Sequence, residues 1–425
     1  MFLLMPLVLL LQVAVGVADP SQRFSPVPGP VSESDPCGEQ GPVGRWVKMS
    51  ATGAPASIHN QSWLDSATVW TGTRLVVALR KDGKWNGTAF DPCGNVWSPI
   101  PETRELPRGE PWPSEAHDRP FAPSHRNGSN DGFEQLSVWD VARKAWVTVK
   151  SDRPPAPRAH YAVALVGRRL LVWGGWAPPR AALGDGAVLD LARKSWKKMS
   201  AAGAPSPRLD PTAVAWTGSR LLIWGGRSAP TWPGPLRALG DGAQYDPARD
   251  RWTPMSPVNA PAPRTGATVA WTGRRLVVVG GVPDQSGAAT LGDGGVYDPV
   301  ADRWTPLQAP GGDVVLPKGN VGPLTRVVVA ADGRVVFLPE ALGEVVVLDA
   351  DHGRWSRISA DVDGAGPGKR NSFRAFLVGR RLIVWGGLTV IAEHLCAPPV
   401  PGQPLCDPWA ETAARNDGWM MVLPK

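Results

Sequence analysis

Four arginines stand at the same place in successive repeats of the chain, and their side chains suit the binding of an anion. Each comes just before a short run of small and apolar residues, and they are Arg158, Arg208, Arg264 and Arg370. Guanidinium groups form forked hydrogen bonds with carboxylate, sulfate and phosphate groups. At one mouth of a channel, the four would bind an anionic ligand. In the alternative, each arginine pairs with an Asp or a backbone carbonyl of a neighbouring repeat and belongs to the scaffold.

Histidine and tryptophan side chains form a second group of candidates, because they gather where the repeat is least regular. They are His59, Trp63, Trp112, His117, His125 and His160. Breaks in a repeat often mark functional sites, and aromatic rings beside loops suit the stacking of sugars. The long loops 227–239, with Trp232, and 388–407 are further candidate binding surfaces. We expect His160, Trp63 and Trp232 to contact a ligand; the alternative is ordinary variation of loops.

The sequence contains none of the local motifs of common catalytic centres. It has no GxSxG, HExxH or Walker motif, and its cysteines lack the CxxC spacing of zinc sites. We therefore expect a noncatalytic protein with no metal or other cofactor. Active sites assembled from several repeats leave no local motif, so a carbohydrate-active enzyme of the sialate epimerase or mutarotase kind is the alternative. Its first candidate acids and bases are Glu134, Glu344 and His160.

The elements that would position these side chains follow a repeat of about fifty residues. A tryptophan marks the start of the last strand in each repeat, at Trp46, Trp97, Trp146, Trp196, Trp252, Trp304 and Trp355. Six residues before each Trp after the first stands an Asp, whose side chain can accept backbone N–H hydrogen bonds in a turn. Four short strands per repeat are typical of a β-propeller blade. The seven tryptophans predict seven blades.

Paired glycines and two recurring dipeptides accompany the spaced tryptophans. The doublets are Gly174-Gly175, Gly225-Gly226, Gly280-Gly281 and Gly386-Gly387, and the dipeptides are Asp-Gly, as at Asp241-Gly242, and Tyr-Asp, at Tyr245-Asp246 and Tyr297-Asp298. By these motifs, residues 44–425 resemble the kelch-repeat family of β-propellers, within the superfamily of the galactose-oxidase central domain. The resemblance implies an all-β ring. It says little about function, because this fold hosts adaptors, carbohydrate-active enzymes and surface binding proteins.

The same resemblance implies two further expectations about the site. In kelch adaptors, arginines at comparable inner positions receive acidic peptides. Copper chemistry of the galactose-oxidase kind needs two Tyr and two His around the metal. Of the three tyrosines, Tyr245 and Tyr297 occupy a repeated core position, and only Tyr161 is left. We therefore reject the copper enzyme.

The two ends of the chain predict how the ring closes. The last repeat has Asp417-Gly418, but its own Trp would fall beyond Lys425. Residues 44–49 form a fourth strand with no preceding three. We therefore expect the N-terminal strand to complete the C-terminal blade, which removes two open strand edges. Residues 101–131 lack the regular hairpin, so a six-bladed ring with an insertion is the alternative.

The positions of the four cysteines favour two disulfides. Cys37 comes just before the N-terminal strand, and Cys93 lies in the equivalent turn of the next blade. A closed ring brings these turns to the same side, so we expect Cys37 to pair with Cys93. Cys396 and Cys406 lie in one long loop and form the second expected pair.

The composition favours an exported binding protein. Residues 1–18 have the pattern of a signal peptide, with a retained membrane anchor as the alternative. Residues 19–43 form a linker rich in Pro, Ser and Gly. The net charge of +7 comes mostly from arginines spread along the repeats, which disfavours nucleic-acid binding. We expect a secreted or extracytoplasmic monomer, without a membrane span once the signal is removed, that binds a protein or an anionic carbohydrate.

Overall fold

The fold was analysed in a computed structural model of the chain. The structure describes residues 35–38, 40–41, 43–55, 66–70, 73–81, 84–103, 121–125, 131–140, 145–166, 168–177, 181–228, 236–283, 291–308, 326–329, 333–338, 344–359, 366–368, 370, 373–394, 409–415 and 417–424. Within these ranges every regular element is a β-strand, which confirms the all-β prediction. None of the described segments is a helix long and apolar enough to cross a membrane.

Seven antiparallel sheets follow one another along the described chain, and we number them in that order. Sheet 1 is β2–β5 (Ser66–Trp70, Leu75–Lys81, Lys84–Asp91, Val96–Thr103), and sheet 2 is β6–β8 (Phe121–His125, Asp131–Asp140, Ala145–Lys150). Sheet 3 is β9, β10, β13 and β14 (Ala162–Val166, Arg169–Trp173, Gly186–Asp190, Ser195–Lys198). Sheet 4 is β15, β16, β19 and β20 (Ala213–Trp216, Leu221–Trp224, Gly242–Asp246, Arg251–Pro254).

The remaining sheets continue the same order. Sheet 5 is β21–β24 (Thr268–Trp271, Leu276–Val279, Gly294–Asp298, Arg303–Leu307), and sheet 6 is β25–β28 (Arg326–Val329, Arg334–Leu338, Glu344–Asp349, Arg354–Ser359). Sheet 7 is β29, β30 and β33 (Arg374–Val378, Arg381–Trp385, Gly418–Val422) with β1 (Val47–Lys48). Two-stranded ribbons follow three of the glycine doublets: β11–β12 (Trp176–Ala177, Ala181–Ala182), β17–β18 (Arg227–Ser228, Arg237–Ala238) and β31–β32 (Leu388–His394, Trp409–Ala414).

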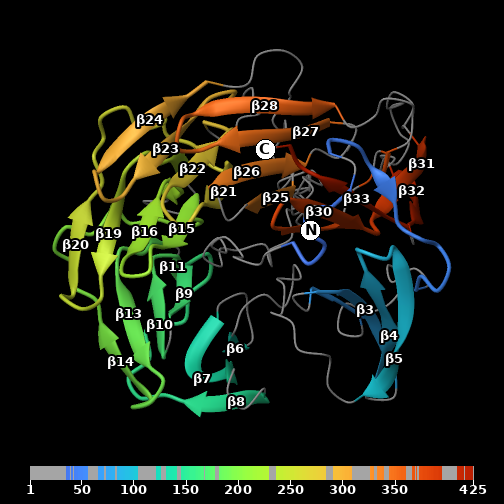
Figure 1. The fold of residues 1–425 in the computed structure, drawn as a ribbon. Coiled ribbons are helices and arrows are strands. Elements are labelled where there is room, and N and C mark those ends of the chain that lie inside the picture. The colour runs from blue at the N-terminus through green and yellow to red at the C-terminus, as the bar shows by residue number, and fades with distance from the viewer. Residues whose placement is uncertain are drawn as a thin grey trace, which may run out of the picture.

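The sheets are arranged around a central region, and in sheets 2 to 6 the first strand lies nearest the centre and the last strand outermost (Figure 1). Neighbouring innermost strands contact each other, as in the pairs β9 and β15, β21 and β25, and β25 and β29. This is the arrangement of a β-propeller. Because the strands of a sheet radiate outward, the turns of successive sheets gather at the two ends of the central region.

The turns form as the sequence predicts. The Asp190 carboxylate accepts hydrogen bonds from the backbone N–H groups of Ala192 and Arg193, at 2.8 and 3.0 Å. The doublet Gly225-Gly226 has φ values of +67° and +106°, which L side chains rarely adopt. A Cβ at Gly226 would lie 2.8 Å from the Asp210 carbonyl oxygen. The glycines therefore allow each second strand to end in close contact with the segment that enters the innermost strand.

Tryptophan pairs join consecutive sheets. Trp173 of β10 packs against Trp252 of β20, and Trp224 of β16 packs against Trp304 of β24, each with ring centroids 5.4 Å apart. The same relation joins sheet 7 to sheet 1, where the Trp385 and Trp97 centroids are 4.8 Å apart. Aromatic pairs of this kind contribute about 1 kcal/mol beyond the burial of their area. The spaced tryptophans therefore join sheets rather than form a ligand site.

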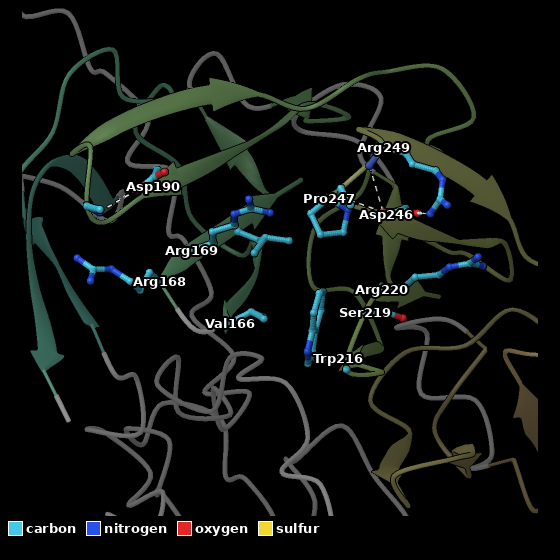
Figure 2. A pocket seen from close by; sticks show the side chains of 14 residues that line it. Val166, Arg168, Arg169, Asp190, Trp216, Ser219, Arg220, Asp246, Pro247 and Arg249 are labelled. Atoms are coloured by element: carbon cyan, nitrogen blue, oxygen red, sulfur yellow. Dashed lines mark hydrogen bonds and ion pairs between the residues drawn. The ribbon is translucent and has the colours of Figure 1, made fainter. Parts of the chain in front are cut away.

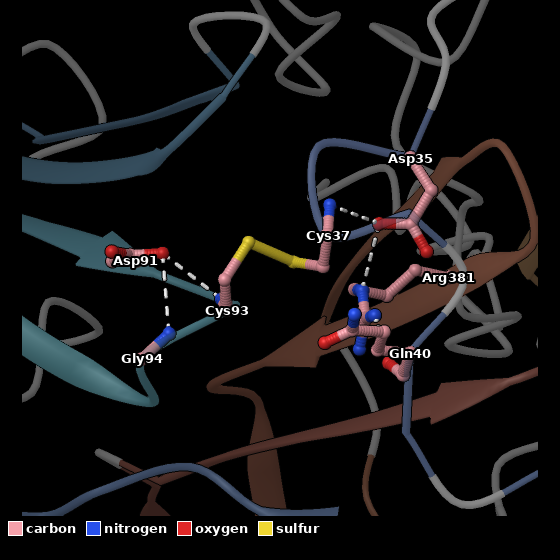
Figure 3. Close-up of a disulfide and its surroundings, with 7 residues drawn as sticks. All are labelled: Asp35, Cys37, Gln40, Asp91, Cys93, Gly94 and Arg381. Atoms are coloured by element: carbon pink, nitrogen blue, oxygen red, sulfur yellow. Dashed lines mark hydrogen bonds and ion pairs between the residues drawn. A yellow bond between two sulfur atoms is a disulfide. The ribbon is translucent and has the colours of Figure 1, made fainter.

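The segment before β1 lies across the last and first sheets. Val47 and Lys48 pair with Met420 and Trp419 of β33. Cys37 forms a disulfide with Cys93, in the β4–β5 turn of sheet 1, as the sequence predicts (Figure 3). The Asp35 carboxylate accepts hydrogen bonds from the Cys37 backbone N–H and from the buried Arg381 guanidinium, at 3.0 and 3.1 Å. This N-terminal segment is thus tied to sheet 7 by hydrogen bonds and to sheet 1 by a covalent bond.

Sheet 2 includes part of residues 101–131, the segment in which the sequence lacks the regular hairpin. It has three strands, and its first pair shifts register between Pro123 and Ser124. Trp146 nevertheless lies in β8, the last strand of the sheet, as the repeat predicts, and it pairs with Trp139 of β7. A central Pro removes a ladder donor, which accounts for the irregular pairing.

Candidate functional site

The four repeated arginines lie inside the scaffold. Arg208 is fully buried, and its side chain uses all of its nitrogens. Its Nε donates to the Ser206 carbonyl, its Nη1 to the Gly225 and Asp241 carbonyls, and its Nη2 to the Asp241 carboxylate at 2.6 Å. Buried charges are stable only when they are paired and hydrogen-bonded in this way. The guanidinium therefore holds the end of β16 to the start of β19.

The other three arginines repeat this arrangement. Arg158 bonds Asp185, Arg264 bonds Asp293, and Arg370 bonds Asp417, with shortest N–O distances of 3.0, 2.9 and 2.9 Å. All four arginines are at most 3% exposed. Each partner is the Asp that precedes the third strand of the same repeat, not of a neighbouring repeat. The geometry thus favours the scaffold alternative for Arg158, Arg208, Arg264 and Arg370.

The pKa values of this arginine–aspartate pair reflect competing effects. Burial would raise the pKa of Asp241, but the Arg208 charge and hydrogen bonds from Ser206 outweigh it and hold the pKa below its ordinary value. Burial lowers the pKa of Arg208, and Asp241 opposes that shift. Both groups therefore stay charged at neutral pH.

His160 lies near the same end of the central region, in contact with the next sheet. Its Nδ1 is 2.7 Å from an Asp210 carboxylate oxygen, and Asp210 also bonds the Arg227 guanidinium. His160 and Asp210 both have positive φ, +60° and +45°, and the Asp210 N–H donates to the His160 carbonyl. The His160 ring lies 6.1 Å from the Trp176 ring. His160 is thus part of a polar link between sheets 3 and 4.

Several predicted residues cannot be placed at a site. Trp63, Trp232, Cys396 and Cys406 lie outside the described residues, as do His59, Trp112 and His117. His125, Glu134 and Glu344 lie in β6, β7 and β27, and only their backbone is described. Among the described residues, no three His, Cys, Asp or Glu side chains cluster as metal ligands do. The predictions for these residues stay predictions.

An open cleft of about 650 Å³ lies between sheets 3 and 4, at the end opposite the glycine doublets. Its walls are the β9–β10 and β13–β14 turns of sheet 3 and the β15–β16 and β19–β20 turns of sheet 4 (Figure 2). Four arginines line it, namely Arg168, Arg169, Arg220 and Arg249, together with Asp190 and Asp246. Its volume is that of an ordinary small-ligand site.

Arg169 is the cation at the centre of this cleft. Its side chain extends between the two sheets toward Pro247, above Trp216, whereas Arg168 and Arg220 extend away on either side (Figure 2). Arg169 is exposed and forms no ion pair within the described part of the chain. The two carboxylates of the cleft are committed, because Asp190 bonds Arg193 and Asp246 bonds Arg249, both at 2.8 Å. Arg169 is therefore available to an external anion.

The junction between sheets 4 and 5 shows why the cleft exists. There Arg220, which corresponds to Arg169, lies 3.5 Å from the Gln244 side-chain oxygen. The Gln244 amide donates to the Tyr297 hydroxyl at 2.8 Å and to the Pro299 carbonyl at 3.4 Å, and so joins the two sheets. Sheet 3 has Val188 at the position of Gln244, because Val188 pairs with Leu171 as Gln244 pairs with Leu222. The smaller Val188 leaves the 3/4 junction open.

The sequence contains a signal for this site that the sequence analysis above did not use. Each second strand of a four-stranded sheet begins at or next to an Arg: Arg74, Arg169, Arg220, Arg275, Arg334 and Arg381. Several of these arginines already have a partner within the chain; for example, Arg275 bonds Asp298 at 2.8 Å. Aligned with the next repeat, the sequence has Val188 beside Arg169 where Gln244 stands beside Arg220.

Comparison with known proteins places the central part of the chain among kelch repeats. A model of the KLHDC2/KLHL20/DRC7 Kelch-repeats domain matches residues 124–321. Acyl-CoA-binding domain-containing protein 4 of Arabidopsis thaliana is 34% identical over 158 residues, which is 36% of this chain and 23% of that protein. The chain thus spans less than a quarter of the length of that relative.

Two further relatives match longer segments at lower identity. N-(sulfonatooxy)prop-2-enimidothioate sulfolyase of Thlaspi arvense is 24% identical over 57% of this chain and 74% of its own. Adagio-like protein 3 of Oryza sativa subsp. japonica is 28% identical over 50% of this chain and 34% of its own. The repeated Gly-Gly, Asp-Gly and Trp positions lie in their expected strands and turns, and the matched residues 124–321 belong to the kelch repeats.

Proposed function

We propose that the seven described sheets are the blades of one ring that is closed by β1. Three observations support this arrangement. β1 completes the sheet formed by β29, β30 and β33, and the Trp97–Trp385 contact joins that sheet to sheet 1. The disulfide between Cys37 and Cys93 spans the same junction. Sheet 2 has three strands, and its Trp146 lies at the spacing of the repeat, which favours a seventh blade over an insertion.

The ring acts as a noncatalytic binding module for an anionic ligand, either a protein or a glycan. Kelch repeats are suited to protein binding, and their rigid sheets present turns and loops at both ends. The observation that carries the proposal is Arg169, an exposed cation without an ion-pair partner in the described chain, at the centre of an open cleft. A charge held without its own partner is ready to bind an anion without first breaking an internal pair.

We also propose that the protein works as a monomer in a secreted or extracytoplasmic compartment. The Cys37–Cys93 disulfide supports this location, because disulfides persist in oxidising compartments and are rare in the cytosol. The apolar start of the chain is the sequence feature that supports export.

A paired screen tests the binding function. The purified protein is probed on an array of neutral, carboxylated and sulfated glycans and with a random-peptide display library, and the bound sugars are assayed for turnover. The proposal predicts saturable binding of at least one anionic class, weakened by salt and without turnover. Conversion of a bound sugar would instead establish the carbohydrate-active enzyme, with the His160–Asp210 pair as its first candidate.

A further inference from the structure

We propose that the cleft between sheets 3 and 4 binds a protein segment that carries one acidic side chain beside an apolar one. The carboxylate bonds Arg169, and the apolar group packs against Trp216 and Pro247. This inference rests on the proposed function and names both the site and the chemistry of its ligand.

The charges in the cleft favour a single acidic group. Only Arg169 extends into the space between the sheets, while Arg168 and Arg220 point away from it (Figure 2). Asp190 and Asp246 stand at the edges of the same cleft, already bonded to Arg193 and Arg249. A uniformly charged polyanion, such as a sulfated glycan, would lie against these two carboxylates and be repelled. One carboxylate aimed at Arg169 meets no such repulsion.

The apolar lining favours a ligand with an apolar group next to its acid. The residues that line the cleft with Arg169 include four apolar ones, namely Val166, Leu171, Trp216 and Pro247. Trp216 is half-buried, so part of its ring is available for contact, and it packs at its other side against the core shared by sheets 3 and 4. A sugar would need several uncharged hydrogen-bonding partners, and Ser219 is the main such side chain among the lining residues. A short peptide segment with alternating acidic and apolar side chains fits this mixture better.

The neighbouring junction lacks the same capacity. Between sheets 4 and 5, Gln244 occupies the space beside Arg220 and bonds the next sheet, and Trp271 is only 4% exposed. Arg220 is thus the counterpart of Arg169 with its approach filled. Of these two junctions, only the one between sheets 3 and 4 leaves its arginine accessible to a ligand.

The test uses peptides selected from a random-peptide display library on the wild-type protein. Their affinities are measured by fluorescence anisotropy for the wild type, Arg169→Gln and Arg168→Gln. The second variant removes the same charge from the adjacent residue, whose side chain points away from the cleft. Heparin-derived oligosaccharides and a poly-glutamate peptide are measured alongside as polyanion probes. Urea unfolding of each variant shows that the exposed substitutions leave the fold intact.

We expect selected peptides to share an acidic residue next to an apolar or aromatic one. Their binding should weaken by about tenfold or more in Arg169→Gln and by less than about twofold in Arg168→Gln. Peptides that bind Arg169→Gln as tightly as the wild type would overturn this inference but leave the binding function standing. Preferential, Arg169-dependent binding of the heparin oligosaccharides would replace the peptide by a glycan. Failure of every peptide and glycan to bind would sink both proposals.

Discussion

Arg169 and Arg220 occupy the same place in consecutive sheets, yet one faces an open cleft and the other meets a filled junction. The backbone does not cause the difference, because both residues begin or precede the second strand of a regular sheet. The cause is the size of one neighbour, which is Val188 beside Arg169 and Gln244 beside Arg220. In a repeat protein, a binding site can therefore arise where one side chain is smaller, without any change of fold.

The two ends of the sheets teach the same lesson about charge. At the glycine-doublet end, Arg208 is fully buried and bonded to Asp241 and to three carbonyls, so it serves the scaffold. At the other end, Arg169 is exposed and has no ion pair in the described chain. The availability of the charge, rather than its repetition, distinguishes a ligand group from a structural one.

The largest expected effect comes from the filled junction. Trp271→Ala removes a side chain that is 4% exposed, and we expect the free energy of unfolding to fall by about 4 kcal/mol. Trp216→Ala, at the open junction, should cost less than half of that, because its ring is only half-buried. Urea unfolding of the two variants measures the difference. Equal losses would mean that the two junctions are packed alike.

The buried arginines should respond almost as strongly. Arg208→Met leaves the Gly225 and Asp241 carbonyls and the Asp241 carboxylate without their donor, and we expect a loss of about 3 kcal/mol. The exposed Arg169→Gln should change the free energy of unfolding by less than about 0.5 kcal/mol. If Arg208→Met kept full stability but lost the ligand, the ligand would bind at the glycine-doublet end instead.

Removing the side chain that fills the 4/5 junction should have a smaller effect. Gln244→Val deletes the hydrogen bonds to the Tyr297 hydroxyl and the Pro299 carbonyl. The Tyr297 hydroxyl still donates to Asp302, so we expect a cost of about 1 kcal/mol. Faster hydrogen exchange confined to the turns of sheets 4 and 5 would show that the junction has opened. Unchanged exchange there would argue against Gln244 as the residue that closes it.

The smallest effect is a dependence on pH at the buried end. The pKa values of Asp241 and Asp417 lie below their ordinary values in the folded chain, and those in the unfolded chain do not. The two carboxylates therefore add stability above the unfolded pKa, and this contribution is lost as the pH falls through the folded pKa. Because Asp241 is partly exposed, its share should stay near or below about 1 kcal/mol. Asp241→Asn should flatten the acid limb of the stability profile, and an unchanged limb would contradict this.

Much of the fold could be predicted from the sequence, because its signals are local. A Trp in the last strand, an Asp in the preceding turn and a Gly doublet after the second strand each depend on a few neighbouring residues. The Cys37–Cys93 disulfide followed once the N-terminal strand was assigned to the last sheet.

The site was harder to predict, because it depends on contacts between sheets. Arg208 bonds Asp241 rather than a ligand because the end of β16 lies beside the start of β19 in the folded chain. The same holds for Arg169, whose freedom depends on Val188 in a strand that follows it and on the turns of sheet 4. Residue types alone suggested cations, but burial and partners decided which cation is available.

The most direct test of the account converts the open junction into the filled one. The variant Val188→Gln places at the 3/4 junction the side chain found at the 4/5 junction, with Tyr245 and Pro247 as the expected partners of the new Gln, as Tyr297 and Pro299 are of Gln244. The account predicts that this variant keeps the wild-type urea midpoint and loses the selected peptides to the same extent as Arg169→Gln. Undiminished peptide binding by a folded Val188→Gln variant would show that the ligand does not enter this cleft.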